Sequence, residues 1–201
     1  MTAPFVVVPV VEGHGEVGAV PVLLRRIGAV LEPERHIDVR LPVRGHRSKL
    51  SRPAEAERYL ALAMNKLGGD NGAILVLIDA DDDCAATVGP ELLSACRAVR
   101  ADVPVSVVLA VTEFEAWFLA SAESLRGRRG LAADLAAPHG PEGIRNAKGW
   151  LQDRRIDGLA YSPTTDQPAL TAIFDMEAAR SSSASFDKLW RDVERLMDET
   201  P

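Results

Sequence analysis

The stretch FVVVPVVEGHGEVG, residues 5–18, decides the fold. Its first half, residues 5–11, is apolar and rich in Val, which is typical of a strand buried on both faces of a parallel sheet. The run ends at Glu12 and Gly13, and from about Val17 to Leu31 apolar residues recur at helical spacing. The chain is therefore expected to open with a strand, a glycine turn and a helix, the first half of a βαβ unit.

The same alternation continues along the chain. Further strands are expected at 37–43, 73–79 and 103–111, and further helices at 53–67, about 88–100, 142–153, 168–179 and 185–198. This order predicts an α/β fold, a Rossmann-like parallel sheet with flanking helices. Because apolar strands stop near residue 122, we expect an α/β domain at 1–122 and a helical C-terminal portion at 123–201, packed together as one unit. Ser185 is expected to cap the last helix and Asp166 to cap an earlier one.

Composition narrows the class of protein. Of 201 residues, 47% are hydrophobic and 26% are charged, which is ordinary for a globular protein. No apolar stretch is long enough to cross a membrane, so a cytoplasmic location is expected. The formal net charge of −6 disfavours non-specific nucleic-acid binding, although an acidic site can still act on nucleic acid through a bound metal. Cys84 and Cys96 are too few for a zinc site.

The glycines at 13, 15 and 18 also match the G-x-G-x-x-G turn that holds a dinucleotide pyrophosphate. Arg44 and Arg47, after the second strand, would suit the 2′-phosphate of NADP. Against this alternative, Glu12 and Glu16 flank the amides that would meet the anion. A P-loop is excluded because no Gly-Lys-Ser/Thr follows the glycines.

Carboxylates follow three of the four expected strands. They are Glu12 and Glu16 after the first, Asp79 and Asp81 after the third, and Glu113 and Glu115 after the fourth. The carboxyl ends of parallel strands share one edge, so these side chains are expected to converge there. Crowded carboxylates repel one another, and a divalent cation relieves the repulsion. Mg²⁺ or Mn²⁺, as one ion or two, is the expected cofactor because carboxylates are its preferred ligands.

Simpler roles stay open for several of these acids. Glu16 lies in the first turn of a helix, where it would offset the helix dipole. Asp82 and Asp83 suit a turn or a helix cap. One of Glu113 and Glu115 would cap or solvate the helix that carries Trp117. Glu12 and Asp79 lie at the ends of strands too apolar to lie at the surface. A functional role is therefore favoured most for this pair.

A strand-ending Glu-Gly followed by a later strand-ending Asp-x-Asp resembles the TOPRIM domain of topoisomerases, bacterial primases and OLD-type nucleases. Glu12-Gly13 and Asp79-Ala80-Asp81 match these motifs, and Glu16 resembles an additional acid of the OLD-type nucleases. The resemblance implies Mg²⁺ or Mn²⁺ dependence and phosphodiester chemistry. Glu12 would then bind metal or act as general acid/base, and Asp79 and Asp81 would bind metal. Glu16 with Glu113 or Glu115 would complete a second metal position.

The whole chain also resembles a small stand-alone group of TOPRIM-like bacterial proteins thought to act in phage defence or abortive infection. The similar stretches are VEGHGE, LIDADDDC, VTEFEAWFLA, the region of Lys148, YSPTTDQPAL and SSSASFDKLW. The resemblance implies a nuclease or related phosphoesterase, with partner proteins of a defence system possible. It leaves open a non-catalytic sensor or interaction subunit, and it does not distinguish DNA, RNA or a small nucleotide as substrate.

Cations near the expected acidic edge complete the set of candidate residues. The basic segment 40–52 follows the second strand, where Arg44, Arg47 and Lys49 would contact a phosphate backbone. His14, inside the glycine turn, would contact a phosphate. Lys148 and Lys188 are lysines in a chain whose cations are mostly Arg, and we expect them as catalytic cations beside Glu12. A solvated surface role remains the alternative for each cation.

Overall fold

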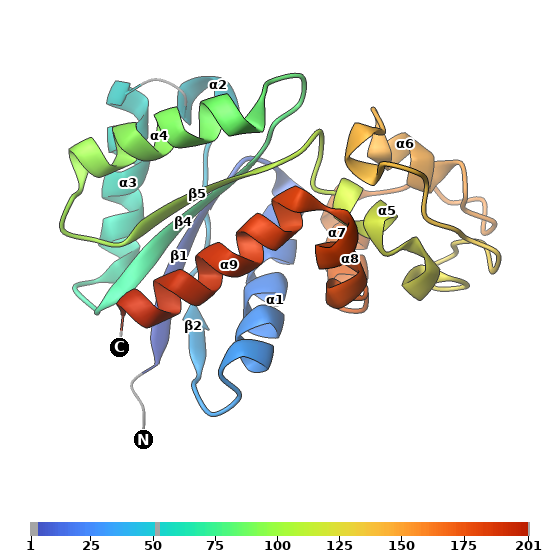
Figure 1. Ribbon diagram of the computed structural model, residues 1–201, viewed down its shortest axis with the longest axis horizontal. Helices are drawn as coiled ribbons and strands as arrows, with labels where there is room; N and C mark the ends of the chain where they lie inside the picture. Colours follow the sequence, from blue (N-terminus) through green and yellow to red (C-terminus); the bar gives the residue numbers. More distant parts are fainter. Residues whose placement is uncertain (1–3, 51–52, 201) are drawn as a thin grey trace.

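The computed structural model describes residues 4–50 and 53–200, without the side chains of Arg47, Leu50 and Pro53. Five parallel strands form one sheet, in the order β2-β1-β4-β5, with β3 pairing with β1 beyond the end of β2 (Figure 1). The strands are β1 (Phe5–Val11), β2 (Ile37–Val39), β3 (Val43–Arg44), β4 (Gly72–Asp79) and β5 (Val105–Ala110). The expected parallel α/β architecture is confirmed.

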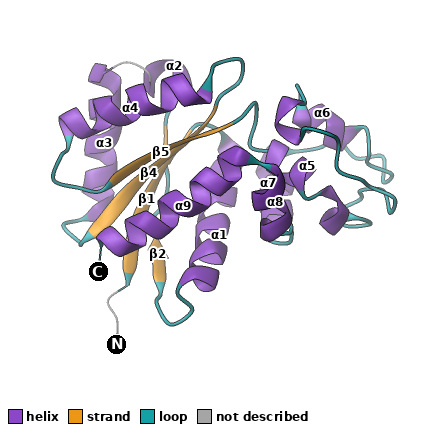
Figure 2. Cartoon of the chain, viewed as in Figure 1, coloured by secondary structure: helices purple, strands orange, loops and turns teal. Residues whose placement is uncertain are grey.

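Helices cover both faces of the sheet (Figure 2). They are α1 (His14–Leu31), α2 (Arg47–Leu50), α3 (Pro53–Leu67), α4 (Ala85–Val99), α5 (Ala116–Ala120), α6 (Ala147–Gln152), α7 (Pro163–Thr171), α8 (Met176–Ser182) and α9 (Ala184–Glu199), with 3₁₀ turns at Ala122–Leu125 and Pro141–Gly143. Successive strand residues alternate between the two faces. Val7, Leu75 and Val108 pack with α1 and α9, whereas Val8 and Val76 pack with α3 and α4.

The strand order places a topological switch point between β1 and β4. From β1 the chain passes through α1 to β2 on one side of β1, and later through α3 to β4 on the other side. α1 and α3, the helices of these two crossovers, lie on opposite faces of the sheet. The two crossovers therefore diverge and leave a crevice at the carboxyl ends of β1 and β4. Ligands of open parallel sheets bind in this position. Glu12 and Asp79 stand at these two strand ends.

Several element boundaries differ from the sequence-based expectation. The strand expected at 37–43 is interrupted before Val43, because Pro42 has no N–H to donate to the ladder. The helix expected at 168–179 is two helices, α7 and α8. The residue that caps α9 is Ser183, whose hydroxyl accepts a hydrogen bond from the Phe186 amide, so the assignment of this cap to Ser185 was wrong.

Asp166 was also wrongly assigned as a helix cap. Ser162 precedes α7 as its first residue outside the helix, and Asp166 lies one turn inside. Its buried carboxylate accepts a hydrogen bond from the Ser162 amide at 2.8 Å and pairs with Arg155 at 3.0 Å. Asp166 therefore fixes the start of α7 from within the helix.

The C-terminal portion packs directly on the sheet layer. α7 lies against α1, and α9 lies along β5 (Figure 1). The Ser185 hydroxyl accepts a hydrogen bond from Trp117 Nε1 at 2.9 Å and donates one to Glu142 Oε1, which joins α9 to α5 and to the 3₁₀ turn at Pro141–Gly143. Among the described helices, none combines the length and the apolar character that crossing a bilayer requires.

Candidate functional site

Three turns with unusual backbone conformation surround the carboxyl edge of the sheet. Asp81 after β4, Thr112 after β5 and Asn146 before α6 have positive φ angles of 49°, 64° and 60°. Such angles are uncommon for residues other than Gly, and strained backbone concentrates at functional sites. The Asp81 amide donates to the Thr112 carbonyl at 3.0 Å, so the first two turns support each other. Together the turns set the positions of Asp79, Glu113 and Lys148.

Lys148 is the centre of an ion-pair cluster. Its Nζ lies 3.1 Å from Glu115 Oε2, 3.3 Å from Glu113 Oε2 and 3.8 Å from Asp79 Oδ2. Its backbone amide also donates to Glu113 Oε2 at 3.2 Å, while Asp79 Oδ1 accepts a hydrogen bond from the Phe114 amide at 2.8 Å. Both Glu113 and Glu115 therefore face the site, which the sequence left open.

Glu115 is fully buried in this cluster. Its Oε1 accepts hydrogen bonds from the Tyr161 hydroxyl at 3.0 Å and from Gln167 Nε2 at 3.4 Å. Burial and the neighbouring Glu115 raise the pKa of Tyr161, so its hydroxyl stays protonated and donates. Glu115 thus ties Lys148 to the segment before α7 and to α7 itself.

Glu16 combines a structural role with a place in the site. Its Oε2 accepts hydrogen bonds from the amides of Glu12 at 2.9 Å and Gly13 at 3.1 Å, so it closes the start of α1. It also lines a cavity of about 320 Å³, called here the inner cavity. The residues around this cavity are Glu12, Gly13, His14, Gly15, Glu16, Asp79, Lys148, Pro163, Thr164 and Gln167.

The pKa values reveal repulsion that the cluster does not relieve. Burial, with contributions from Glu115 and Glu12, raises the pKa of Glu16 to about 7. Burial and the charge of Glu16 raise the pKa of Asp79 well above its ordinary value, and burial raises the pKa of Glu115. Burial alone would lower the pKa of Lys148, but attraction to Glu115, Asp79 and Glu113 outweighs it, and that pKa lies above its usual range. Further positive charge would stabilise the ionised carboxylates.

The donor chemistry of the inner cavity suits a hard divalent cation. Glu12, Glu16 and Asp79 supply carboxylate oxygens, which Mg²⁺ and Mn²⁺ prefer. Within residues 4–50 and 53–200, however, no three His, Cys, Asp or Glu side chains are grouped closely enough to enclose a metal as they stand. Lys148 lies among Asp79, Glu113 and Glu115. A cation would therefore bind in the inner cavity, between Asp79 and Glu12, and the carboxylate side chains would have to move closer together to hold it.

The Gln167 amide oxygen is an additional acceptor beside the inner cavity. This side chain is buried, and its Oε1 accepts no hydrogen bond within the described part of the chain. A Cβ on Gly15 would overlap this oxygen and would lie 2.5 Å from the Pro163 carbonyl oxygen, while one on Gly18 would lie 2.9 Å from Pro168 Cγ. Gly15 and Gly18 are therefore required by the close packing of α1 against α7, which is a reason for the glycine spacing that does not involve nucleotide binding.

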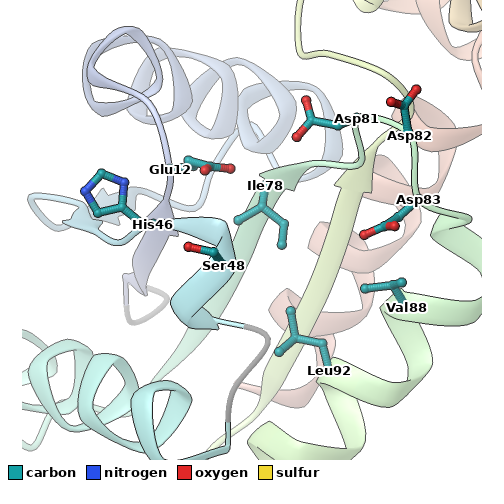
Figure 3. Close-up of a pocket in the computed structure, with 9 residues that line it drawn as sticks. All are labelled: Glu12, His46, Ser48, Ile78, Asp81, Asp82, Asp83, Val88 and Leu92. Carbon is teal, nitrogen blue, oxygen red and sulfur yellow. The ribbon is translucent and has the colours of Figure 1, made fainter.

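A second cavity, the outer cavity, opens on the opposite face of the sheet and has a volume of about 720 Å³. Its lining consists of Glu12, His46, Ser48, Ile78, Asp81, Asp82, Asp83, Val88 and Leu92 (Figure 3). Asp79 and Asp81 were expected to bind metal at one site, but their side chains line different cavities. Asp79 lines the inner cavity, whereas the exposed Asp81 lines the outer one, because the positive φ of Asp81 turns the chain after β4. Glu12 lines both cavities.

Of the residues expected to contact substrate, His14 and Arg44 lie at the carboxyl edge of the sheet. His14 lines the inner cavity, and Arg44 is exposed at the end of β3, opposite Val11 in the ladder. Lys49 is exposed in α2. The side chain of Arg47 falls outside what the structure describes.

Lys188, expected as a catalytic cation, is not brought to the cluster. Its Nζ pairs with Asp192 one turn along α9 and donates to the Val107 carbonyl in β5 at 2.9 Å. Lys188 therefore caps a backbone carbonyl in the strand at one edge of the sheet. Conversely, Tyr161 and Gln167 were not singled out from the sequence, although both belong to the quoted stretch YSPTTDQPAL.

Fold and site together define a Rossmann-like α/β protein with a lysine-bridged acidic cluster at the switch point of its parallel sheet. The chain belongs to the family described as "Domain of unknown function (DUF4276)", which matches residues 11–194. The match extends from the end of β1 into α9 and includes every residue of the cluster. No curated protein and no solved structure matches the chain.

Proposed function

We propose that this protein is a divalent-metal-dependent phosphoesterase that cleaves phosphodiester bonds of nucleic acid. The observation that carries the proposal is the gathering of four carboxyl groups, two buried and two partly buried, at the switch point. Glu16, Asp79, Glu113 and Glu115 gather there. Lys148 pairs with the last three, whereas Glu16 accepts hydrogen bonds from the Glu12 and Gly13 amides. Such a site gains stability from a bound divalent ion, and a loaded ion attracts a phosphate.

The residues divide into two groups. Glu12, Glu16 and Asp79 are the side chains that would hold Mg²⁺ or Mn²⁺, with Asp81 available from the opposite face. When bound, the ion would supply a Lewis acid and a water of lowered pKa. Glu113 and Glu115 hold Lys148, whose permanently protonated ammonium offers positive charge to a pentacovalent phosphorus centre.

The surroundings favour a polymeric anion as substrate. Arg44 and Lys49 are exposed on the segment that follows β2, and Arg44 is the ladder partner of Val11 at the end of β1. Guanidinium and ammonium groups in this place can contact the phosphates that flank a scissile bond. The resemblance of Glu12-Gly13 and Asp79-Ala80-Asp81 to TOPRIM motifs supports the same chemistry. The wider resemblance to the stand-alone TOPRIM-like group supports a role in phage defence, and a cytoplasmic location is part of the proposal. Neither resemblance chooses between DNA and RNA.

Two measurements test this function. Calorimetry of the metal-free protein with MnCl₂ should give saturable binding that Asp79→Asn weakens at least tenfold and that the exposed control Asp198→Asn leaves unchanged. Labelled single- and double-stranded DNA and RNA should be cleaved only with Mg²⁺ or Mn²⁺, with at least a hundredfold loss in Asp79→Asn. Equal manganese affinity in the wild-type protein and Asp79→Asn would refute the metal site.

One observation favours a second function, a non-catalytic interaction or sensor subunit. Lys148 already bridges Asp79, Glu113 and Glu115, as an internal counterion would in a site that needs no metal. In that case the acidic cluster stabilises the fold, and the surface around it contacts a partner protein of a defence system. Absence of cleavage on all four nucleic-acid substrates, with no manganese binding, would favour this function.

A further inference from the structure

The outer cavity has a different chemical character from the inner one. Ile78, Val88 and Leu92 form an aliphatic floor, on the face of the sheet that α3 and α4 cover. The carboxylates of Asp81, Asp82 and Asp83 stand along one wall, and His46 and Ser48 stand opposite (Figure 3). An aliphatic floor beneath polar walls is the usual construction of a small-molecule site.

From this arrangement we infer that the outer cavity binds one nucleoside unit of the substrate, with the base on the aliphatic floor. The inference rests on the proposed function, because it takes the substrate to be nucleic acid. The cavity volume of about 720 Å³ falls within the usual range for ligand sites. Glu12 lines both cavities, so a phosphate attached to this nucleoside reaches the site of the metal past Glu12.

The charge of the wall selects among the bases. Carboxylate oxygens accept hydrogen bonds and each accepts more than one, so Asp81 and Asp83 keep acceptor capacity beside other contacts. Asp82 pairs with Arg145 at 2.8 Å at the rim. Carboxylates recognise the amino groups of cytosine and comparable donors. Adenosine, cytidine and guanosine therefore fit this wall, whereas uridine and thymidine lack an exocyclic amino group.

Nuclear magnetic resonance of the methyl-labelled full chain, kept metal-free with EDTA, tests the inference without cleavage. Adenosine and cytidine should shift the methyl signals of Ile78, Val88 and Leu92 and leave Leu62, exposed on α3, unchanged. Uridine should bind at least about tenfold more weakly, the factor for one lost hydrogen bond of about 1.4 kcal/mol. A short cytidine-containing single strand that binds more tightly than cytidine would identify a strand, and equal affinity would identify a free nucleotide.

Two variants should fill the cavity from different walls. Val88→Phe and Ser48→Trp are each expected to weaken adenosine binding at least tenfold, and the matched control Val30→Phe, exposed at the far end of α1, should bind like the wild type. Unshifted floor methyls with every nucleoside, or equal responses to uridine and cytidine, would overturn the inference. The binding assay contains no metal and so does not depend on cleavage. Nucleoside binding by a protein that fails to cleave nucleic acid with Mg²⁺ or Mn²⁺ would contradict the proposed function alone. Metal-dependent cleavage that Val88→Phe leaves unchanged would contradict this inference alone.

Discussion

Replacing Glu16 with Gln should make the metal-free protein more stable, although it alters a buried residue that caps a helix. Glu16 is 4% exposed, and burial with the charges of Glu115 and Glu12 raises its pKa from 4.5 to about 7. Each pKa unit corresponds to about 1.4 kcal/mol, so the ionised side chain costs roughly 3 kcal/mol above pH 7. Glutamine carries no charge and avoids this cost.

The raised pKa already includes the hydrogen bonds at the start of α1, which favour the ionised form. Glu16 Oε2 accepts from the amides of Glu12 and Gly13, and the amide oxygen of Gln can accept the same bonds more weakly. Bonds to a charged acceptor are stronger than neutral ones by roughly 1 kcal/mol. Because the shift from 4.5 to about 7 is net of this difference, the expected stabilisation by Glu16→Gln at pH 8 remains roughly 3 kcal/mol.

The pH dependence of the difference has a definite sign. Below about pH 4.5 Glu16 is protonated in both the folded and the unfolded chain, and it contributes nothing. Between about 4.5 and 7 the unfolded chain releases the proton that the folded protein retains, so the wild-type protein loses stability as pH rises. The advantage of Glu16→Gln should accordingly grow across this window and remain constant above pH 7.

Urea unfolding in EDTA, followed by circular dichroism from pH 4.5 to pH 8, measures this difference. The exposed control Glu57→Gln on α3 should show no such change. Mg²⁺ at a thousand times its dissociation constant should then reverse the order, because such a ligand stabilises the folded state by about 4.1 kcal/mol. A Glu16→Gln protein less stable than the wild type in EDTA at pH 8 would show that the buried charge is already compensated.

Three further predictions concern the packing and the cluster. Gly15→Ala should cost roughly 3 kcal/mol of unfolding free energy, measured by urea denaturation, because its Cβ would collide with α7. Gly18→Ala should cost less, because its Cβ would meet only the Pro168 ring, at 2.9 Å, and Ala is favoured over Gly in a helix by about 1 kcal/mol. Lys148→Met should cost about 2 kcal/mol and make the melting temperature more dependent on Mg²⁺, while Lys188→Met should leave manganese affinity in calorimetry unchanged. Tyr161→Phe should cost about 1 kcal/mol, since it removes a hydrogen bond from a buried carboxylate, and an unchanged urea midpoint would contradict that role.

The parallel sheet could be predicted from the sequence because its signal is local. The apolar run 5–11 and the run that ends at Asp79 are rich in β-branched residues, and segments with helical periodicity lie between them. A parallel sheet with helices on both faces buries such strands completely. The convergence of acids at the carboxyl edge followed from the direction of the strands. The break in the expected strand at Pro42 was not predicted. A missing N–H interrupts a strand only where the neighbouring strand would accept a hydrogen bond from it, and that depends on the pairing of the strands.

The parts of the site that could not be predicted depend on contacts across long sequence separations. Tyr161 and Gln167 reach Glu115, which is 46 and 52 positions away in the sequence. Lys148 and Lys188 looked equivalent as lysines in an Arg-rich chain, and only packing distinguishes them. Lys148 follows a left-handed turn at Asn146 that directs it to the cluster, whereas Lys188 lies on the face of α9 that meets β5. Composition contains no trace of this difference.

The glycines of EGHGEVG illustrate how one pattern can have two physical causes. A dinucleotide site needs glycine so that a pyrophosphate can approach the backbone. Here Gly15 has its Cα against Gln167 and Pro163 because a helix, and not a phosphate, approaches the backbone. The same close approach carries Gln167 to Glu115 and so to Lys148, the cation of the acidic cluster. The glycine turn at residues 12–18 thus resembles an anion site but lies beside a cluster of carboxylates. Because these carboxylates repel one another, a cation is favoured there over an anion.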